Sequence, residues 1–168
     1  MNLPPKRIAI IYYSHSGRTK EVAYRIRDLM NSLNITADIF EVKCVKEYGN
    51  NYLRMSLDAL FGRVIEYRGL EGFDPSKYDL IVVGTPIWAG SVTPPIRSFL
   101  IKSKGLMRTP IACFITSKRR KNYSAKFSRF LKSLGYDVIS DISIVDLGVN
   151  MEDLVKFVEA LSRYPSTD

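Results

Sequence analysis

Apolar positions along the chain fall into two alternating patterns, short continuous runs and stripes spaced by three or four residues. The short runs are rich in β-branched residues and predict buried strands at residues 7–13, 36–45, 79–84, 110–116 and 137–147. The stripes predict helices at residues 17–33, 53–64, 93 onward, 127–134 and 151–161. The stripe of the second helix consists of Leu53, Leu57, Leu60, Phe61 and Val64.

This alternation predicts an α/β fold class, namely a three-layer, doubly wound, five-stranded parallel sheet with helices on both faces. No Gly-, Pro- or Ser-rich stretch divides the chain, so we expect residues 1–168 to form a single domain. With a strand order of 2-1-3-4-5, the order reverses between the first and third strands. Ligands of such sheets bind at that point, beyond the carboxyl ends of the strands.

The segment after the first predicted strand has the composition of an anion-binding loop. Ser14, Ser16 and Thr19 supply hydroxyl groups, and Gly17 allows a ligand to approach the backbone closely. The helix that follows adds amide groups without partners and the positive end of its dipole. A single glycine does not match the loops that bind dinucleotides or nucleoside triphosphates, which favours a terminal phosphate group. An ordinary helix cap by Ser14 or Ser16 is the alternative.

The segment after the third predicted strand combines a proline, a glycine and the one tryptophan of the chain. Pro86 is expected to end the strand, and Gly90 permits backbone conformations closed to other residues. The indole of Trp88 has a large face for stacking on an aromatic ring, and the alternative is that it only anchors the core. Together the two loops predict a ligand with a phosphate group at one end and a flat ring at the other.

Charge is distributed unevenly along the sequence. The whole chain carries a net charge of +8, but residues 80–136 contain 11 Lys and Arg and no Asp or Glu. This concentration predicts a partner that is acidic or anionic, with a solvated face that only keeps the protein in solution as the alternative.

The remaining composition indicates an intracellular protein. The two cysteines, Cys44 and Cys113, lie in apolar runs without metal-ligand spacing and are expected in the core. The first residues lack the pattern of a signal peptide, and no apolar run approaches the ~20 residues of a membrane span. We therefore expect a soluble, cytoplasmic protein.

The two loops together resemble those of the flavodoxin family. The segment Tyr13-Ser14-His15-Ser16-Gly17-Arg18-Thr19 is similar to the family's phosphate loop for flavin mononucleotide (FMN), and residues 78–90, running on to Pro94-Pro95, are similar to its second flavin loop. The resemblance covers essentially the whole chain and implies a flavodoxin-like fold, FMN as cofactor and electron transfer as activity. It implies phosphate binding by Ser14, Ser16, Gly17, Arg18 and Thr19. It also implies that the flavin ring is lined by Thr85, Pro86, Ile87, Trp88, Ala89 and Gly90.

The loop after the fourth predicted strand departs from the family pattern. The family has glycine or aromatic residues there, whereas this chain has four consecutive cations, Lys118-Arg119-Arg120-Lys121. Thr116 and Ser117 can still donate hydrogen bonds to the flavin, and Tyr123 is a candidate for a second stacking face. Electron-carrying flavodoxins are typically acidic around the flavin, so this chain is expected to have acidic partners or a different activity.

Three functions remain open from the sequence. The leading one is an FMN-binding electron-transfer protein, which requires no catalytic side chain because the cofactor carries the chemistry. The alternative is an NAD(P)H-dependent reductase of quinones or flavins, in which the four cations attract the phosphates of the dinucleotide. The third is a module that binds nucleic acid or an anionic surface through residues 97–132, although its cations are not interleaved with exposed aromatic residues. His15 lacks a visible orienting partner and is expected to be a loop residue rather than a general base.

Overall fold

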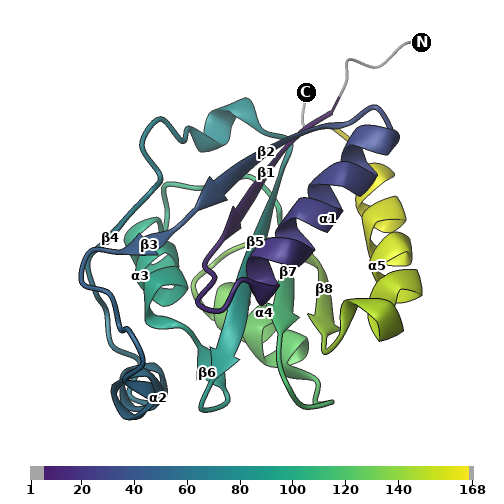
Figure 1. Cartoon of the computed structure of the whole chain (residues 1–168). Coiled ribbons are helices and arrows are strands. Elements are labelled where there is room, and N and C mark those ends of the chain that lie inside the picture. Colours follow the sequence, from purple (N-terminus) through teal and green to yellow (C-terminus); the bar gives the residue numbers. More distant parts are fainter. Residues whose placement is uncertain (1–5, 167–168) are drawn as a thin grey trace.

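A parallel sheet of five strands forms the centre of the computed structural model, which describes residues 6–166 (Figure 1). In spatial order its strands are β2 (Thr36–Glu41), β1 (Arg7–Tyr12), β5 (Leu80–Trp88), β7 (Ile111–Thr116) and β8 (Val138–Ile144). Numbered by their place among these five, they follow the order 2-1-3-4-5, which confirms the predicted topology. The order reverses between β1 and β5, so the carboxyl ends of these two strands define the expected ligand site.

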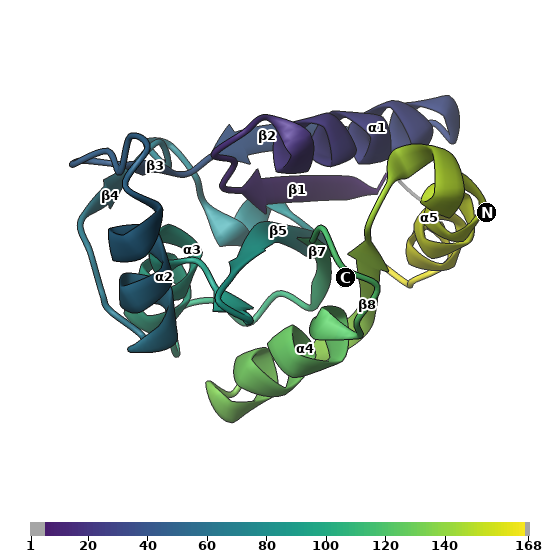
Figure 2. The ribbon, with the colours of Figure 1, turned by 60° about the horizontal axis from the view of Figure 1, so that its bottom comes forward.

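Helices cover both faces of the sheet, as a doubly wound fold requires (Figure 2). One face packs against α1 (Arg18–Ser32) and α5 (Leu147–Ser162). The other packs against α3 (Pro94–Lys102) and α4 (Tyr123–Ser133). The short helix α2 (Tyr52–Leu60) belongs to this second side but lies at the margin of the molecule.

The core consists of two apolar layers, one on each side of the sheet. Successive residues of a strand point to opposite faces, and β1 shows this clearly. Ile8 and Ile10 belong to the layer under α1 and α5, whereas Ala9 and Ile11 belong to the layer under α3 and α4. All four side chains are fully buried, which is why the strand reads as a continuous apolar run.

The third predicted strand extends beyond its predicted end at Gly84, so the expectation that Pro86 ends it is wrong. β5 continues to Trp88 and still pairs with β7 at Pro86. β1 pairs with β5 only as far as Gly84, so beyond that point one side of β5 has no parallel neighbour. A proline without an N–H group is tolerated on such an edge. β5 then turns back into β6 (Ser91–Val92), which pairs with it antiparallel.

Other boundaries differ by a few residues. The second predicted strand is interrupted at Val42, after which β3 (Lys43–Cys44) pairs with β4 (Tyr67–Arg68) away from the main sheet. The last strand ends at Ile144, because Asp146 caps α5 by accepting hydrogen bonds from the amides of Gly148 and Val149. A single 3-10 turn, η1 (Pro75–Lys77), precedes β5.

The apolar stripe of the second predicted helix lies outside the core. The helix is present as α2, but its buried residues are Met55, Asp58 and Ala59. Asp58 is held inside because it accepts a hydrogen bond from the Tyr48 hydroxyl at 2.9 Å and pairs with two arginines. The stripe therefore faces water.

Candidate functional site

A cavity of about 590 Å³ opens at the carboxyl end of the sheet, beside the point where the strand order reverses. Its walls come from the loops after β1 and β7, from the end of β5 with the hairpin that follows it, and from α2, which are far apart in the sequence. Ten of the thirteen residues predicted for the site line this cavity: Ser16, Arg18, Thr19, Pro86, Ile87, Trp88, Ala89, Gly90, Thr116 and Ser117. The other three, Ser14, Gly17 and Thr85, do not line it.

The N-terminus of α1 is left open toward the cavity. Gly17 occupies the cap position with φ of 93°, a left-handed conformation that favours glycine, and no side chain within residues 6–166 caps the helix. Ser14 Oγ instead accepts a hydrogen bond from the Gly17 amide at 3.1 Å, which closes the loop. By contrast, α2, α4 and α5 are capped by the side chains of Asn51, Asn122 and Asp146. The first-turn amides of α1 thus remain available to an anion.

Two threonines join this loop to the loop after β7. Thr19 Oγ1 and Thr116 Oγ1 lie 2.7 Å apart, and both side chains are buried. Arg18 Nη1 donates to the Ser117 carbonyl at 3.5 Å, and Ser117 Oγ donates to the Arg119 carbonyl at 2.9 Å. These contacts hold the first and third loops in fixed relation, so their polar groups face the same cavity.

Thr85 supports the cavity wall from behind. Its side chain is fully buried, and its Oγ1 lies 2.8 Å from Thr93 Oγ1 and donates to the Pro86 carbonyl at 2.9 Å. Thr93 is the cap residue of α3, so the pair connects the end of β5 to the start of that helix.

A tight hairpin forms the next part of the wall. Trp88 pairs with Ser91, and the two residues between them, Ala89 and Gly90, have φ values of 47° and 73°. Positive φ at both central residues matches a type I′ turn, the usual two-residue hairpin connection. Lys126 Nζ donates to the Gly90 carbonyl at 2.6 Å and ties the hairpin to α4.

Trp88 is the centre of an aromatic cluster. Its ring centroid lies 5.6 Å from Tyr13, 5.7 Å from His15 and 5.2 Å from Tyr48, each with the rings nearly perpendicular. Such edge-to-face packing fixes the indole at the cavity wall. The Tyr13 hydroxyl is buried without a hydrogen-bond partner among the described residues, and burial raises its pKa above the usual value for tyrosine.

The charge of the cavity wall is entirely positive. Arg18, Lys118 and Arg119 line it, whereas no Asp or Glu among the described residues does. The four cations of residues 118–121 are exposed, and none of them forms an ion pair with a carboxylate in the part of the chain that the structure describes. The site is therefore suited to a ligand that carries negative charge.

Several cavity residues were missed from the sequence. Tyr52, Met55 and Ser56 of α2 complete one wall, and His15 also contributes. Tyr123, the candidate for a second stacking face, does line the cavity. Nothing in the local pattern of α2 indicates a ligand, because its place beside the cavity depends on how the segment between β3 and β4 folds back. His15 lies between the predicted site residues Ser14 and Ser16, so its place in the loop was the available signal.

No protein-family model matches the sequence, and no curated protein matches it. Solved structures do match. The chain is similar to a flavoprotein in complex with FMN from Lactobacillus acidophilus NCFM, with 28% identity over 89% of this chain and 98% of that one and a TM-score of 0.68. It is also similar to the two-electron reduced flavodoxin of Megasphaera elsdenii, with 12% identity over 94% and 99% of the two chains and a TM-score of 0.66. For a flavodoxin of Streptococcus pneumonia TIGR4, the identity is 17% over 93% and 97%, with a TM-score of 0.59.

Fold and site together define a doubly wound α/β protein with a ligand cavity at its topological switch point. The structural matches extend over nearly the full length of both chains. The chain therefore has a flavodoxin-like fold.

Proposed function

We propose that this protein binds FMN in the cavity at the carboxyl end of the sheet and acts in electron transfer. The observation that carries the proposal is a single cavity of about 590 Å³ shared by an uncapped helix N-terminus and an aromatic wall at Trp88. The similar Lactobacillus acidophilus flavoprotein is described in complex with FMN. FMN carries a phosphate group and a flat ring, which are the two parts that these walls suit.

The residues present fit such a cofactor. The first-turn amides of α1, the Ser16 hydroxyl and the Arg18 guanidinium would hold the phosphate group. The hairpin at Ala89 and Gly90 would present its backbone to the ring, beside Trp88. When bound, FMN supplies one- and two-electron redox chemistry.

The surrounding side chains would tune that chemistry. Lys118 and Arg119 line the cavity, and positive charge close to a redox group favours its more negative state. They would thus raise the reduction potential relative to a site with an acidic rim. The same charges suit an acidic or anionic redox partner.

A second candidate function is direct reduction by NAD(P)H. It is favoured by Lys118 and Arg119, which lie on the wall of the cavity and have no carboxylate partner among the described residues. A dinucleotide carries phosphate groups that such cations attract. The reductase and the carrier differ in whether NADPH alone reduces the bound flavin.

No helix within residues 6–166 has the length and hydropathy needed to cross a bilayer. Cys44 and Cys113 are buried free thiols, as is usual for proteins of reducing compartments. We therefore also propose that the protein acts in the cytoplasm.

Titration of the apoprotein with FMN, followed by flavin fluorescence, tests the cofactor site. Ser16→Ala and Arg18→Gln should each weaken binding by about tenfold, because each removes a hydrogen bond to a charged group. Ser32→Ala is the matched control, since Ser32 lies at the opposite end of α1 and bonds only the Leu29 carbonyl. Equal affinities in all variants would contradict the phosphate assignment.

Anaerobic addition of NADPH to the FMN-loaded protein then separates the two functions. Bleaching of the flavin absorbance by NADPH alone would identify a reductase. A flavin that stays oxidised with NADPH but is reduced by dithionite would identify a carrier that depends on a partner protein.

A further inference from the structure

Helix α2 presents a large apolar surface to water. Leu53, Leu57 and Leu60 are 72%, 43% and 59% exposed, and the adjoining Phe61 and Val64 are 75% and 51% exposed. We call these five residues the α2 face. The opposite side of the helix is already packed, because Met55 and Ala59 are buried against the core. In both ribbon views α2 lies at the margin of the molecule (Figures 1 and 2).

The exposure is concentrated rather than scattered. Half of the exposed large hydrophobic residues in the described chain fall within residues 52–64, and the others are spread over distant elements. A buried aromatic side chain contributes about 150–250 Å² of contact surface, so Phe61 alone leaves more than about 100 Å² in water. A stable interface buries about 800 Å² on each partner around an apolar centre. The α2 face is large enough to form such a centre.

The spacing of the face suits another helix. Within α2, Leu53, Leu57 and Leu60 follow one another at intervals of four and three residues. This is the spacing that lines up side chains along one seam when two helices pack side by side. In a dimer with two-fold symmetry the same patch serves both chains, so two copies of α2 would supply matching seams.

The charges around the face favour a second copy over other partners. Residues 45–66 contain three basic and three acidic side chains, so this segment has no net charge. Arg54 and Arg63 lie 3.6 and 3.5 Å from the Asp58 carboxylate and are thus already paired. An acidic protein or an anionic lipid would be attracted to residues 80–136 instead, where the cations are concentrated.

We propose that the α2 face is the contact surface of a symmetric homodimer. Tyr52 and Ser56 of the same helix contribute to the cavity wall. Dimerisation would therefore hold that wall of the cavity in place. The dimer does not depend on which cofactor the cavity binds.

Sedimentation velocity of the full-length chain across a range of concentrations tests this directly. A chain of 19.1 kDa should sediment as a species of twice that mass. The double variant Leu53→Ser/Phe61→Ser should weaken the dimer by about 100-fold or more, since it removes the two most exposed side chains of the face. Leu106→Ser is the matched control, because Leu106 is 78% exposed in the turn after α3 and should leave the dimer unchanged.

A wild-type protein that stays monomeric at every concentration would overturn the proposal, as would a double variant that dimerises like the wild type. Circular dichroism and urea denaturation establish that each variant is folded. Raising the salt concentration should strengthen the dimer, because it screens repulsion between two chains of net charge +8 without weakening apolar contacts. Monomers that bind phosphatidylglycerol vesicles through Leu53 and Phe61 would show instead that lipid covers the face.

Chemical cross-linking provides a second measurement with a less disruptive variant. Both native thiols, Cys44 and Cys113, are buried, so Leu57→Cys would place the one accessible thiol at the middle of the face. A short bis-maleimide reagent should convert this variant to a covalent dimer. Leu106→Cys should remain monomeric under the same conditions, and equal cross-linking of the two variants would contradict the proposed interface.

Discussion

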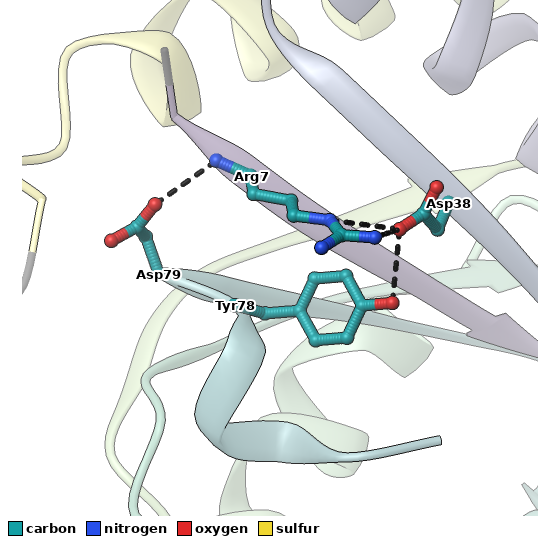
Figure 3. Close-up of polar contacts among 4 residues, drawn as sticks. All are labelled: Arg7, Asp38, Tyr78 and Asp79. Atoms are coloured by element: carbon teal, nitrogen blue, oxygen red, sulfur yellow. Dashed lines mark hydrogen bonds and ion pairs between the residues drawn. The ribbon is translucent and has the colours of Figure 1, made fainter. Parts of the chain in front are cut away.

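The two ends of the parallel sheet differ in how they use polar groups. At the amino end, Asp38 accepts hydrogen bonds from Arg7 Nε and Nη2 at 3.1 and 2.8 Å and from the Tyr78 hydroxyl at 2.9 Å (Figure 3). The Arg7 amide donates to Asp79 Oδ2 at 3.0 Å, and the Arg7 guanidinium lies over the Tyr78 ring, 5.2 Å from its centroid. Charges of both signs meet there and are paired.

At the carboxyl end the cations of the cavity wall have no carboxylate partners among the described residues. Arg18, Lys118 and Arg119 line the cavity with no carboxylate beside them among the described residues. α1 begins without a side-chain cap, and the Tyr13 hydroxyl is buried without a partner in residues 6–166. Packing of aromatic side chains around Trp88, rather than ion pairs, stabilises this end of the sheet.

The difference separates groups that stabilise the fold from groups that bind a ligand. Polar groups that already have partners inside the protein have little left to offer a ligand, whereas unpaired cations and amides gain most when an anion arrives. The amino end is therefore expected to contribute to stability and the carboxyl end to binding. Substitutions at each end test this separation.

Trp88→Ala should have the largest effect, because it removes the ring on which three others pack. We expect a loss of about 2–3 kcal/mol in the free energy of unfolding, below the range for fully buried rings because Trp88 is half-buried. FMN affinity should also fall by at least tenfold. Urea denaturation and FMN titration measure the two effects.

Phe73→Ala is the matched control for Trp88→Ala at the other end of the sheet. Phe73 is half-buried and packs on Tyr78 at 5.9 Å and on Phe40 at 5.1 Å. It should lose comparable stability but keep its FMN affinity. If both variants lost affinity equally, general unfolding rather than the site would explain the effect of Trp88→Ala.

Lys118→Glu/Arg119→Glu should weaken FMN binding by about tenfold at low salt and leave the free energy of unfolding unchanged. Both side chains are exposed, so they contribute attraction to an anion but little to stability. The control is Lys104→Glu/Arg108→Glu, which makes the same change of charge in the same basic stretch, away from the cavity. Equal loss of affinity in the two double variants would assign the effect to net charge alone.

The sequence was sufficient to predict the fold because the strands are buried on both faces. Such strands appear as continuous apolar runs, and the chain order of strands and helices leaves few topologies. The positions of the two loops followed from the ends of these strands. Thus the strand order was predicted, and the fold is similar to that of a solved flavodoxin. A cavity lies where the strand order reverses.

Details that depend on distant contacts were not predictable from local patterns. β5 continues through Pro86 because β1 ends earlier and leaves one edge free, and no local signal reports the length of a neighbouring strand. Thr85 is turned away from the cavity by its contact with Thr93. The stripe of α2 matches a core-facing helix in sequence, and only the buried, paired Asp58 shows which side faces inward.

Asp38→Ala should cost about 1 kcal/mol of stability, because the buried Tyr78 hydroxyl loses its acceptor. FMN affinity should not change, since Asp38 lies at the end of the sheet opposite the cavity. Asp28→Ala serves as the control, because Asp28 is exposed and pairs only with the neighbouring Arg27. Thermal or urea denaturation measures the loss. If both variants lost the same stability, the hydrogen bond from Tyr78 to Asp38 would contribute no more than an exposed ion pair.

The smallest effect concerns the pH dependence of the same cluster. Burial, together with the hydrogen bond to Asp38, raises the pKa of Tyr78 from 10.0 to about 12. The folded state thus favours the protonated phenol, and this stabilisation is fully present below pH 10 and is lost as the pH rises toward 12. Tyr78→Phe should be less stable than the wild type at pH 8, and the gap should narrow above pH 10. Urea denaturation of both proteins at pH 8, 10 and 11 measures this, and a gap that stays constant or widens would show that the phenol does not titrate as its surroundings predict.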